Sequence, residues 1–455
     1  MAYEWPGKHK PMRHQVETVK FLAKNNRCFC LDGLGTGKTL SAIWASDFLI
    51  KHERIHTVLV VAPLSICDWV WERELFQTVP HRSMVRLNGD RRTKQRIVKN
   101  ARHNYIIVNP ESLDIIREYT REIDLVLVDE FTKFKNHKSK RWKALNRIAK
   151  DKMLWMLSGT PAPQGPLDAY GPIKLVNPEA PSFLRFRSLT MEQITRFVWY
   201  PKPGSEEVVA QYMQPAIRHT RAECYDLPEV STEPYEYQLT KAQQQAINQF
   251  QAEAVAEIDE YQIPATTAAA VLSKCLQTMA GGIYYEDEEG KHVKEVNAKP
   301  YYEAIQSICE QADTPVLYFC PFRSQVDATA KALEKAGFKV ECITGDTKNR
   351  DRGRIFDAIQ AGRLDAVVAV ARTMSHGLTL TNARYVVWAS PPYSFEEYEQ
   401  ANGRVVRKGQ SRKVTIYHLV CNDMSKRLFR RLRTREKLQK TLLEILQKGL
   451  TEVKE

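Results

Sequence analysis

Long hydrophobic runs are absent from this chain of 455 residues, since no stretch reaches the roughly 18 apolar residues that a membrane-spanning helix needs. The first residues, MAYEWPGKHK, have neither the apolar segment of a signal peptide nor the arginine-rich pattern of a transit peptide. The nine cysteines are scattered, and only Cys28 and Cys30 are close, on a predicted strand where they could not easily bridge. We therefore expect a cytoplasmic protein with reduced thiols, no membrane association and no cysteine-based metal site.

The composition is that of a globular protein, with 43% hydrophobic and 27% charged residues. Its length suits two domains better than one. Lys and Arg outnumber Asp and Glu by 67 to 54, a net charge of +13. This excess favours a polyanionic partner, although a basic protein without such a partner remains the alternative.

Short β-rich runs alternate with helical stretches in two parts of the chain, 25–160 and 315–420. The alternation predicts an α/β fold with two parallel sheets covered by helices. Between them, about 165–300, we find no clear strand ladder, and 241–258 and 266–279 are predicted as helices. The basic stretch 424–450 is also predicted as a helix, which either packs back onto the fold or forms a separate binding tail.

The run LDGLGTGKTLSAIW places a glycine-rich turn between a strand and a helix, as a phosphate-binding loop requires. Gly35 and Gly37 would let the backbone approach phosphates, Lys38 would reach the β and γ phosphates, and Thr39 would hold magnesium. Asp32 stands where the general motif has its first glycine. The alternative is a glycine-rich turn that binds nothing.

The run DLVLVDEF is an apolar strand that ends in two acids, Asp129 and Glu130. At the carboxyl edge of a parallel sheet, Asp129 would hold magnesium and Glu130 would orient the attacking water. In isolation, a solvated turn explains the pair equally well.

In the second part, the run YEQANGRVVRKGQ carries Arg404 and Arg407, which we predict on one face of a helix. Arginines supplied by a second domain can neutralise charge on the γ phosphate. A basic surface helix is the alternative.

Taken together, the motifs resemble those of the Swi/Snf-type ATPases of helicase superfamily two, from about residue 8 to about residue 420. The similar segments, in order, are KPMRHQ, DGLGTGKT, VVAPLSICDWVWERE, VNPES, DEFTKFKN, LSGTP, QPAIRHTRAECYDLPEV, LSKCLQTMAGGI, YFCPFR, TGDTKNRDRGRIFDAI, SHGLTLTNARYVVWASP and QANGRVVRKGQ. One departure is Thr132, where family members commonly carry a histidine. This puts in doubt the contact that couples the DEFTKFKN segment to the LSGTP segment, but not hydrolysis.

The resemblance implies an α/β fold of two tandem RecA-like parallel-sheet lobes with a helical insertion between them. We place lobe 1 at 1–170, the insertion at 171–295, lobe 2 at 296–422 and a basic C-terminal helix at 423–455. It also implies ATP and Mg²⁺ as cofactors, with Gln15 contacting adenine and Ser158 and Thr160 coupling ATP to the DNA track. The nucleotide-binding set is Gln15, Gly35, Thr36, Gly37, Lys38, Thr39 and Gly377, the metal ligands are Thr39 and Asp129, and the catalytic set is Lys38, Asp129, Glu130, Gln400, Arg404 and Arg407.

Nucleic acid should be held by its sugar-phosphate backbone. The candidates are Ser65, Lys135, Asn136, Thr344, Gly345, Arg372 and Thr373. The stretch 133–143, KFKNHKSKRWK, is the densest basic patch, with a solvated helix face as the alternative.

The leading hypothesis is a monomeric translocase on double-stranded or branched DNA, cytoplasmic in a bacterium or a virus-infected cell, with a targeting protein as a further candidate partner. The alternatives are a strand-separating DNA or RNA helicase, for which we locate no wedge such as a β-hairpin, and a slowly hydrolysing nucleic-acid-binding scaffold.

Overall fold

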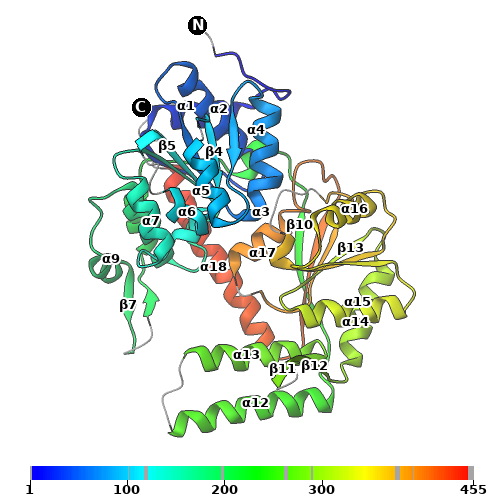
Figure 1. Ribbon diagram of the computed structural model, residues 1–455. Helices are drawn as coiled ribbons and strands as arrows, with labels where there is room; N and C mark the ends of the chain where they lie inside the picture. The colour runs from blue at the N-terminus through cyan, green and yellow to red at the C-terminus, as the bar shows by residue number, and fades with distance from the viewer. Residues whose placement is uncertain are drawn as a thin grey trace. The chain divides into compact units, whose positions relative to one another are not determined.

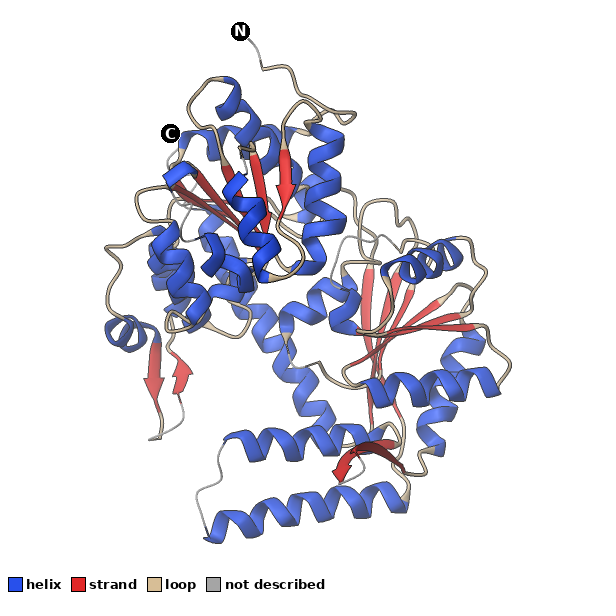
Figure 2. Ribbon diagram, in the orientation of Figure 1, coloured by secondary structure: helices blue, strands red, loops and turns tan. Residues whose placement is uncertain are grey.

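The computed structural model describes residues 3–100, 102–116, 121–195, 199–260, 265–287, 290–374, 380–392 and 394–448. The chain divides into two compact units (Figures 1 and 2). The first unit comprises 1–226 and 434–455, and the second comprises 227–433.

The first unit is built on a seven-stranded sheet whose described pairings are all parallel, in the order β3-β4-β2-β5-β6-β1-β9. Its strands are β1 (Arg27–Cys30), β2 (Val58–Val61), β3 (Met84–Arg86), β4 (Tyr105–Val108), β5 (Leu125–Asp129), β6 (Met153–Leu157) and β9 (Ala216–Ile217). Apolar residues fill both faces of these strands because each face packs against a separate core. In β2, for example, Leu59 and Val61 belong to one core, while Val58 and Val60 belong to the other.

Helices cover both faces of this sheet (Figure 2). The α-helices are α1 (Arg13–Lys24), α2 (Lys38–Lys51), α3 (Leu64–Ile66), α4 (Arg73–Thr78), α5 (Arg91–Asn100), α6 (Leu113–Ile116), α7 (Lys140–Ile148), α8 (Tyr170–Val176), α9 (Phe183–Thr190), α10 (Ser205–Tyr212) and α11 (Arg221–Cys224). A π-helical turn, η1 (Cys67–Glu72), and the 3₁₀ turns η2 (Pro110–Ser112), η4 (Phe131–Phe134) and η5 (Pro166–Ala169) lie between them.

A two-stranded antiparallel ribbon extends away from the first sheet, next to α9 (Figure 1). It pairs β7 (Met191–Gln193) with β8 (Trp199–Pro201). Arg187 of α9 stacks its guanidinium over the Trp199 ring, with its carbon 4.3 Å from the ring centroid. This cation–π contact ties the ribbon to the helix.

The second unit contains a six-stranded sheet, also parallel in its described pairings, in the order β10-β17-β16-β13-β15-β14. Its strands are β10 (Val230–Glu236), β13 (Val316–Cys320), β14 (Val340–Ile343), β15 (Ala366–Val370), β16 (Tyr385–Trp388) and β17 (Val414–Val420). The other elements are α12 (Lys241–Glu260), α13 (Ala265–Met279), the β11 (Gly282–Asp287) and β12 (Gly290–Glu295) ribbon, α14 (Lys299–Gln311), α15 (Arg323–Lys335), α16 (Asn349–Gln360), the 3₁₀ turn η6 (Ala371–Met374), α17 (Phe395–Asn402) and α18 (Asp423–Lys448).

The two parallel sheets confirm the predicted fold class, but the expectation of no strand ladder between 165 and 300 is wrong. β9 and β10 lie in that segment and form an edge strand of the first and the second sheet, respectively. β9 has only two residues and β10 contains Pro234 and charged residues, so neither resembles an apolar strand. The boundary between the units, Asp226–Leu227, also lies within the predicted insertion.

The C-terminal helix α18 forms as predicted, and Phe429 and Leu432 on its first half are buried in a core of the second unit. Among the described residues, no helix is both long and apolar enough to cross a membrane.

Candidate active site

The glycine-rich loop joins β1 to α2 and closes on itself. Gly35 and Gly37 have φ values of 76° and 89°, in the left-handed region that favours glycine. The Thr36 hydroxyl donates a hydrogen bond of 2.8 Å to the Gly33 carbonyl. Gly37 is the N-cap of α2, so the free N–H groups of the first helical turn begin at this loop. A helix N-terminus with this backbone suits an anionic phosphate.

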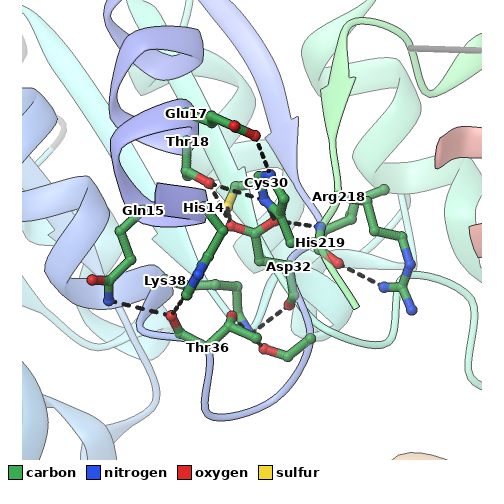
Figure 3. A network of polar contacts seen from close by, with 12 residues as sticks. His14, Gln15, Glu17, Thr18, Cys30, Asp32, Thr36, Lys38, Arg218 and His219 are labelled. Carbon is green, nitrogen blue, oxygen red and sulfur yellow. Dashed lines mark hydrogen bonds and ion pairs between the residues drawn. The ribbon is translucent and has the colours of Figure 1, made fainter. Parts of the chain in front are cut away.

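Lys38 folds back over the loop (Figure 3). Its Nζ donates to the carbonyl oxygens of Asp32 and Gly33, at 2.8 and 3.0 Å. The ammonium group therefore lies within the loop, where phosphate oxygens would take the place of these carbonyls.

Helix α1 places Gln15 against the same loop. Its Nε2 donates to the Thr36 carbonyl at 3.3 Å, and the neighbouring His14 Nε2 lies 2.9 Å from the same oxygen. A Cβ atom at position 37 would collide with the Gln15 amide nitrogen, so a larger residue there would displace the Gln15 side chain from the loop. Contact of Gln15 with adenine stays a prediction.

The carboxylate of Asp129 is buried at the end of β5, where its side chain is held by Trp71. The Trp71 indole Nε1 donates to Asp129 Oδ2 at 2.8 Å, and Trp71 is fully buried. Burial raises the pKa of Asp129, while the indole hydrogen bond and the nearby positive charge of Lys38 oppose that rise. The charge of Lys38 is therefore close enough to act on Asp129, so the glycine-rich loop and the acidic pair belong to one site.

Trp71 is the residue at this site that sequence reasoning missed. The run CDWVWERE contains two tryptophans, and its spacing does not say which one faces the sheet. The π-helical turn η1 aims Trp71 at Asp129, in keeping with the frequent occurrence of such turns at functional sites.

Glu130 has a left-handed backbone, with φ of 51°, which is costly for a residue other than glycine. Its Oε2 accepts a hydrogen bond of 3.5 Å from the hydroxyl of Ser158, and that hydroxyl also accepts from the Thr160 backbone N–H at 3.1 Å. The DEFTKFKN and LSGTP segments are thus in contact through Ser158. Thr132 is buried in η4, the turn that begins directly after Glu130. The effect of Thr132 on the coupling between the DEFTKFKN and LSGTP segments stays a prediction.

Asp32, the departure from the general phosphate-loop motif, lies at the centre of a buried polar network (Figure 3). Its carboxylate accepts hydrogen bonds from the Thr18 hydroxyl at 2.7 Å and from the His219 backbone N–H at 2.8 Å, and lies 2.9 Å from His219 Nδ1. The other ring nitrogen of His219 lies 3.1 Å from Glu17 Oε2. The carboxylate at position 32 therefore has a structural partner far along the chain, which the motif alone does not reveal.

In the second unit, Gln400 is buried in α17 and donates to Glu396 Oε1 at 3.3 Å. The prediction that Arg404 and Arg407 share a helical face is wrong, because α17 ends at Asn402 and Gly403 caps it. Both arginines lie in the turns that follow and are half-buried. Gly377 lies outside the described residues.

The predicted nucleic-acid contacts of the second unit lie together. Arg352 donates to the carbonyls of Thr344 and Thr373, at 2.8 and 3.0 Å, so it links the loops that follow β14 and β15. Gly345 and Arg372, the other two candidates, are exposed in these loops.

In the first unit, Lys135 and Asn136 are exposed, and Lys135 forms an ion pair of 3.3 Å with Asp168. Of Ser65, the structure describes only the backbone, in α3. The aromatic residues of the basic stretch 133–143 face inward: Phe134 is fully buried, and the Trp142 indole donates to the Gly171 carbonyl at 2.9 Å. Its cationic side chains, in contrast, are exposed, so this stretch presents charge to the solvent.

Two parallel sheets covered by helices, a glycine-rich loop before α2 and an acidic pair after β5 are features of helicase-type ATPases. The chain belongs to the SNF2-related family: the SNF2-related domain matches residues 14–280, and the helicase conserved C-terminal domain matches 300–409. This membership confirms the resemblance seen in the sequence, and the chain is a nucleic-acid-stimulated ATPase.

Relatives differ greatly in length. The chain is 24% identical to putative protein p41 of Acyrthosiphon pisum secondary endosymbiont phage 1, over 96% of this chain and 98% of that protein. It is also 24% identical to the SWI/SNF-related matrix-associated actin-dependent regulator of chromatin subfamily A-like protein 1 of Xenopus tropicalis, over 90% of this chain but only 42% of that protein. A solved structure, the Sulfolobus solfataricus SWI2/SNF2 ATPase core in complex with dsDNA, is 21% identical, with a TM-score of 0.46 over 99% of this chain and 96% of that one.

Proposed function

We propose that this chain is an ATP-driven motor that translocates along double-stranded DNA and remodels protein–DNA complexes or branched DNA. The observation that carries the hydrolysis step is the meeting of four motifs at one edge of the first sheet. Gln15 packs on the phosphate loop, the charge of Lys38 acts on Asp129, and Glu130 is bonded to Ser158. These residues come from separate parts of the chain, so their convergence favours a working ATPase centre over a glycine-rich turn and a solvated acidic pair.

In the proposed mechanism, Lys38 and the N-terminus of α2 bind the β and γ phosphates. Thr39 and Asp129 would hold Mg²⁺, which neutralises phosphate charge when bound. Glu130 orients a water molecule, whose oxygen attacks the γ phosphorus while the bond to the β–γ bridging oxygen breaks, giving ADP and phosphate. The half-buried Arg404 and Arg407 and the buried Gln400 are the groups that we assign to the γ phosphate from the second unit.

Duplex DNA is the proposed track for chemical reasons. The net charge of +13 and the exposed cations of 133–143 suit a polyanion, and backbone contacts need no base sequence. The names of two relatives, the chromodomain-helicase-DNA-binding protein 1-like proteins of Danio rerio and Mus musculus, also refer to DNA. The set we assign to the backbone is Ser65, Lys135, Asn136, Thr344, Gly345, Arg372 and Thr373.

The test is steady-state ATPase activity without nucleic acid and with single-stranded DNA, duplex DNA or RNA, using Glu130→Gln as the control. We expect strong stimulation by duplex DNA that the variant loses. Low turnover that no nucleic acid stimulates would overturn the motor proposal and favour a slowly hydrolysing scaffold.

One observation favours a second candidate, strand separation. We located no hairpin in the sequence, but the β7–β8 ribbon extends from the first unit, with Ile194 after β7 and Tyr200 in β8 exposed at 57% and 60%. Exposed apolar and aromatic side chains such as these can open a base pair at a branch point. If the ribbon is a wedge, Tyr200→Ala should reduce displacement of a strand from a forked duplex while duplex-stimulated ATPase activity remains. Equal displacement by both proteins would remove this candidate.

A further inference from the structure

The segment 215–225, which we call the coupling segment, is bonded to the phosphate loop along its length and ends where the second unit begins. We propose that it responds to the nucleotide state of the loop, and that His219 and Tyr225 are positioning residues that transmit this state toward the second unit. The inference rests on the proposed binding of ATP at the loop. It assigns to these two side chains a role that the ATPase centre itself does not require.

Main-chain hydrogen bonds join the coupling segment to β1 and continue beyond the end of that strand. The Leu31 N–H donates to the Ile217 carbonyl at 2.8 Å, and the Gly33 N–H donates to the His219 carbonyl at 2.9 Å. The sheet pairing therefore extends into the phosphate loop itself. Any shift of the loop backbone at Gly33 must move the segment or break this bond.

The side chain of His219 adds a second attachment. It bridges Asp32 of the loop and Glu17 of α1, at 2.9 and 3.1 Å, and is largely buried (Figure 3). The backbone N–H of His219 donates to the same Asp32 carboxylate. Arg218 contributes a further bond of 2.7 Å to the Leu31 carbonyl. Because His219 contacts one acid of the loop and one acid of α1, it holds the loop, α1 and the coupling segment in a fixed arrangement.

The far end of the coupling segment touches the loop again. The Tyr225 hydroxyl donates to the Gly35 carbonyl at 3.3 Å, and its ring packs edge-on against His14 with centroids 5.9 Å apart. Between these attachments, a Cβ atom at Gly33 would lie 2.8 Å from Arg221 Cγ, so the segment approaches the loop closely. Two residues after Tyr225 the chain enters the second unit, at Leu227.

Nucleotide binding should disturb these attachments because Lys38 uses the same residues. Its Nζ donates to the carbonyls of Asp32 and Gly33, the two residues that bind His219. Phosphate oxygens would compete for the ammonium group and release both carbonyls. The rearranged loop would then pull on His219 and Tyr225, and through them on the chain toward Leu227. Nucleotide occupancy and the path of the inter-unit chain are thereby linked.

The first test is amide hydrogen exchange on the full Glu130→Gln chain, with and without Mg²⁺–ATP. We expect nucleotide to change the exchange rate about threefold or more in the stretch 217–226, because the segment follows the rearranged loop. Adding His219→Asn should abolish this response while the loop still responds. His56→Asn is the matched control, because His56 is an exposed histidine of the same unit. A role in stability alone would change exchange equally in both nucleotide states, and that result would overturn the inference.

The second test separates coupling from hydrolysis. Tyr225→Phe removes only the hydroxyl that meets Gly35, and Tyr212→Phe is its control, because Tyr212 of α10 is another half-buried tyrosine of the first unit. Displacement of a triplex-forming strand and ATP hydrolysis are measured together on duplex DNA. We expect the displacement per ATP to fall about threefold in Tyr225→Phe, the size of effect typical of one neutral hydrogen bond. An unchanged ratio would refute the role of Tyr225. If the wild-type chain displaces nothing, the translocase proposal fails, and the exchange experiment still decides the inference.

Discussion

Replacing Trp71 with phenylalanine should raise the Mg²⁺ concentration that this ATPase needs for activity. The indole N–H donates to the Asp129 carboxylate at 2.8 Å, and both residues are buried. A hydrogen bond to a charged group contributes about 1.5–3 kcal/mol. Since about 1.4 kcal/mol corresponds to a factor of ten, its loss should raise the Mg²⁺ concentration for half-maximal activity roughly 10- to 100-fold.

The assay is a Mg²⁺ titration of ATP hydrolysis at fixed ATP, with Trp155→Phe as the matched control. Trp155 is equally buried, in β6, but its indole donates to the Asn25 carbonyl at 3.0 Å, away from Asp129. Both variants lose ring volume and one hydrogen bond, so both should lose stability. Only Trp71→Phe should shift the titration. Similar midpoints for the wild type and Trp71→Phe, or equal shifts in both variants, would refute the positioning role of Trp71.

Three further predictions concern pH and salt. Burial opposes protonation of His219, but the contacts of this histidine with Asp32 and Glu17 raise its pKa above the ordinary value of 6.5. The protonated histidine therefore stabilises the fold fully below pH 6.5, and this stabilisation is lost as pH rises through the folded-state pKa. Urea unfolding should therefore show a larger difference between the wild type and His219→Gln at about pH 6 than at about pH 9, and equal differences would contradict this. Burial, aided by the charge of Arg433, lowers the pKa of His418 to about 3, so the unfolded chain binds the proton first and stability falls with acidification. Between about pH 6.5 and pH 5 this should cost about 2 kcal/mol, a loss that His418→Gln should not show. Lys135→Ala should weaken duplex binding regardless of sequence and reduce the salt slope by about one, and an unchanged slope would remove Lys135 from the DNA interface.

Much of the fold could be predicted because both sheets consist mainly of short apolar runs separated by helical patterns. The phosphate loop and the acidic pair could also be located, since glycine, lysine and acid positions in them are fixed by local geometry. The helix carrying Gln400 was predicted to continue through Arg407, but it ends at Asn402. The sequence pattern does not show that Gly403 caps this helix and that Arg404 lies in the following turn.

The partners of the site could not be predicted because they are distant in sequence. Trp71 meets Asp129 across 58 positions, and His219 meets Asp32 across 187. No local periodicity records such contacts, since they depend on which strand edges come together. The edge strand β10 was missed for a related reason. Its polar residues suit a strand paired on one side only, and that environment exists only after β17 has formed.

That late pairing affects how the second unit can be made. β10 pairs with β17, and Val230 lies opposite Val414. The first strand of the second unit can therefore pair only after the last strand has been synthesised. During synthesis at about 5–20 residues per second, β10 spends on the order of ten seconds outside the ribosome without its partner. The charged residues Glu233 and Glu236, together with Pro234, keep this unpaired strand from joining other chains. A fragment that begins at residue 296 would omit β10 and leave β17 as an uncovered edge, so an expression fragment of the second unit should begin before Val230.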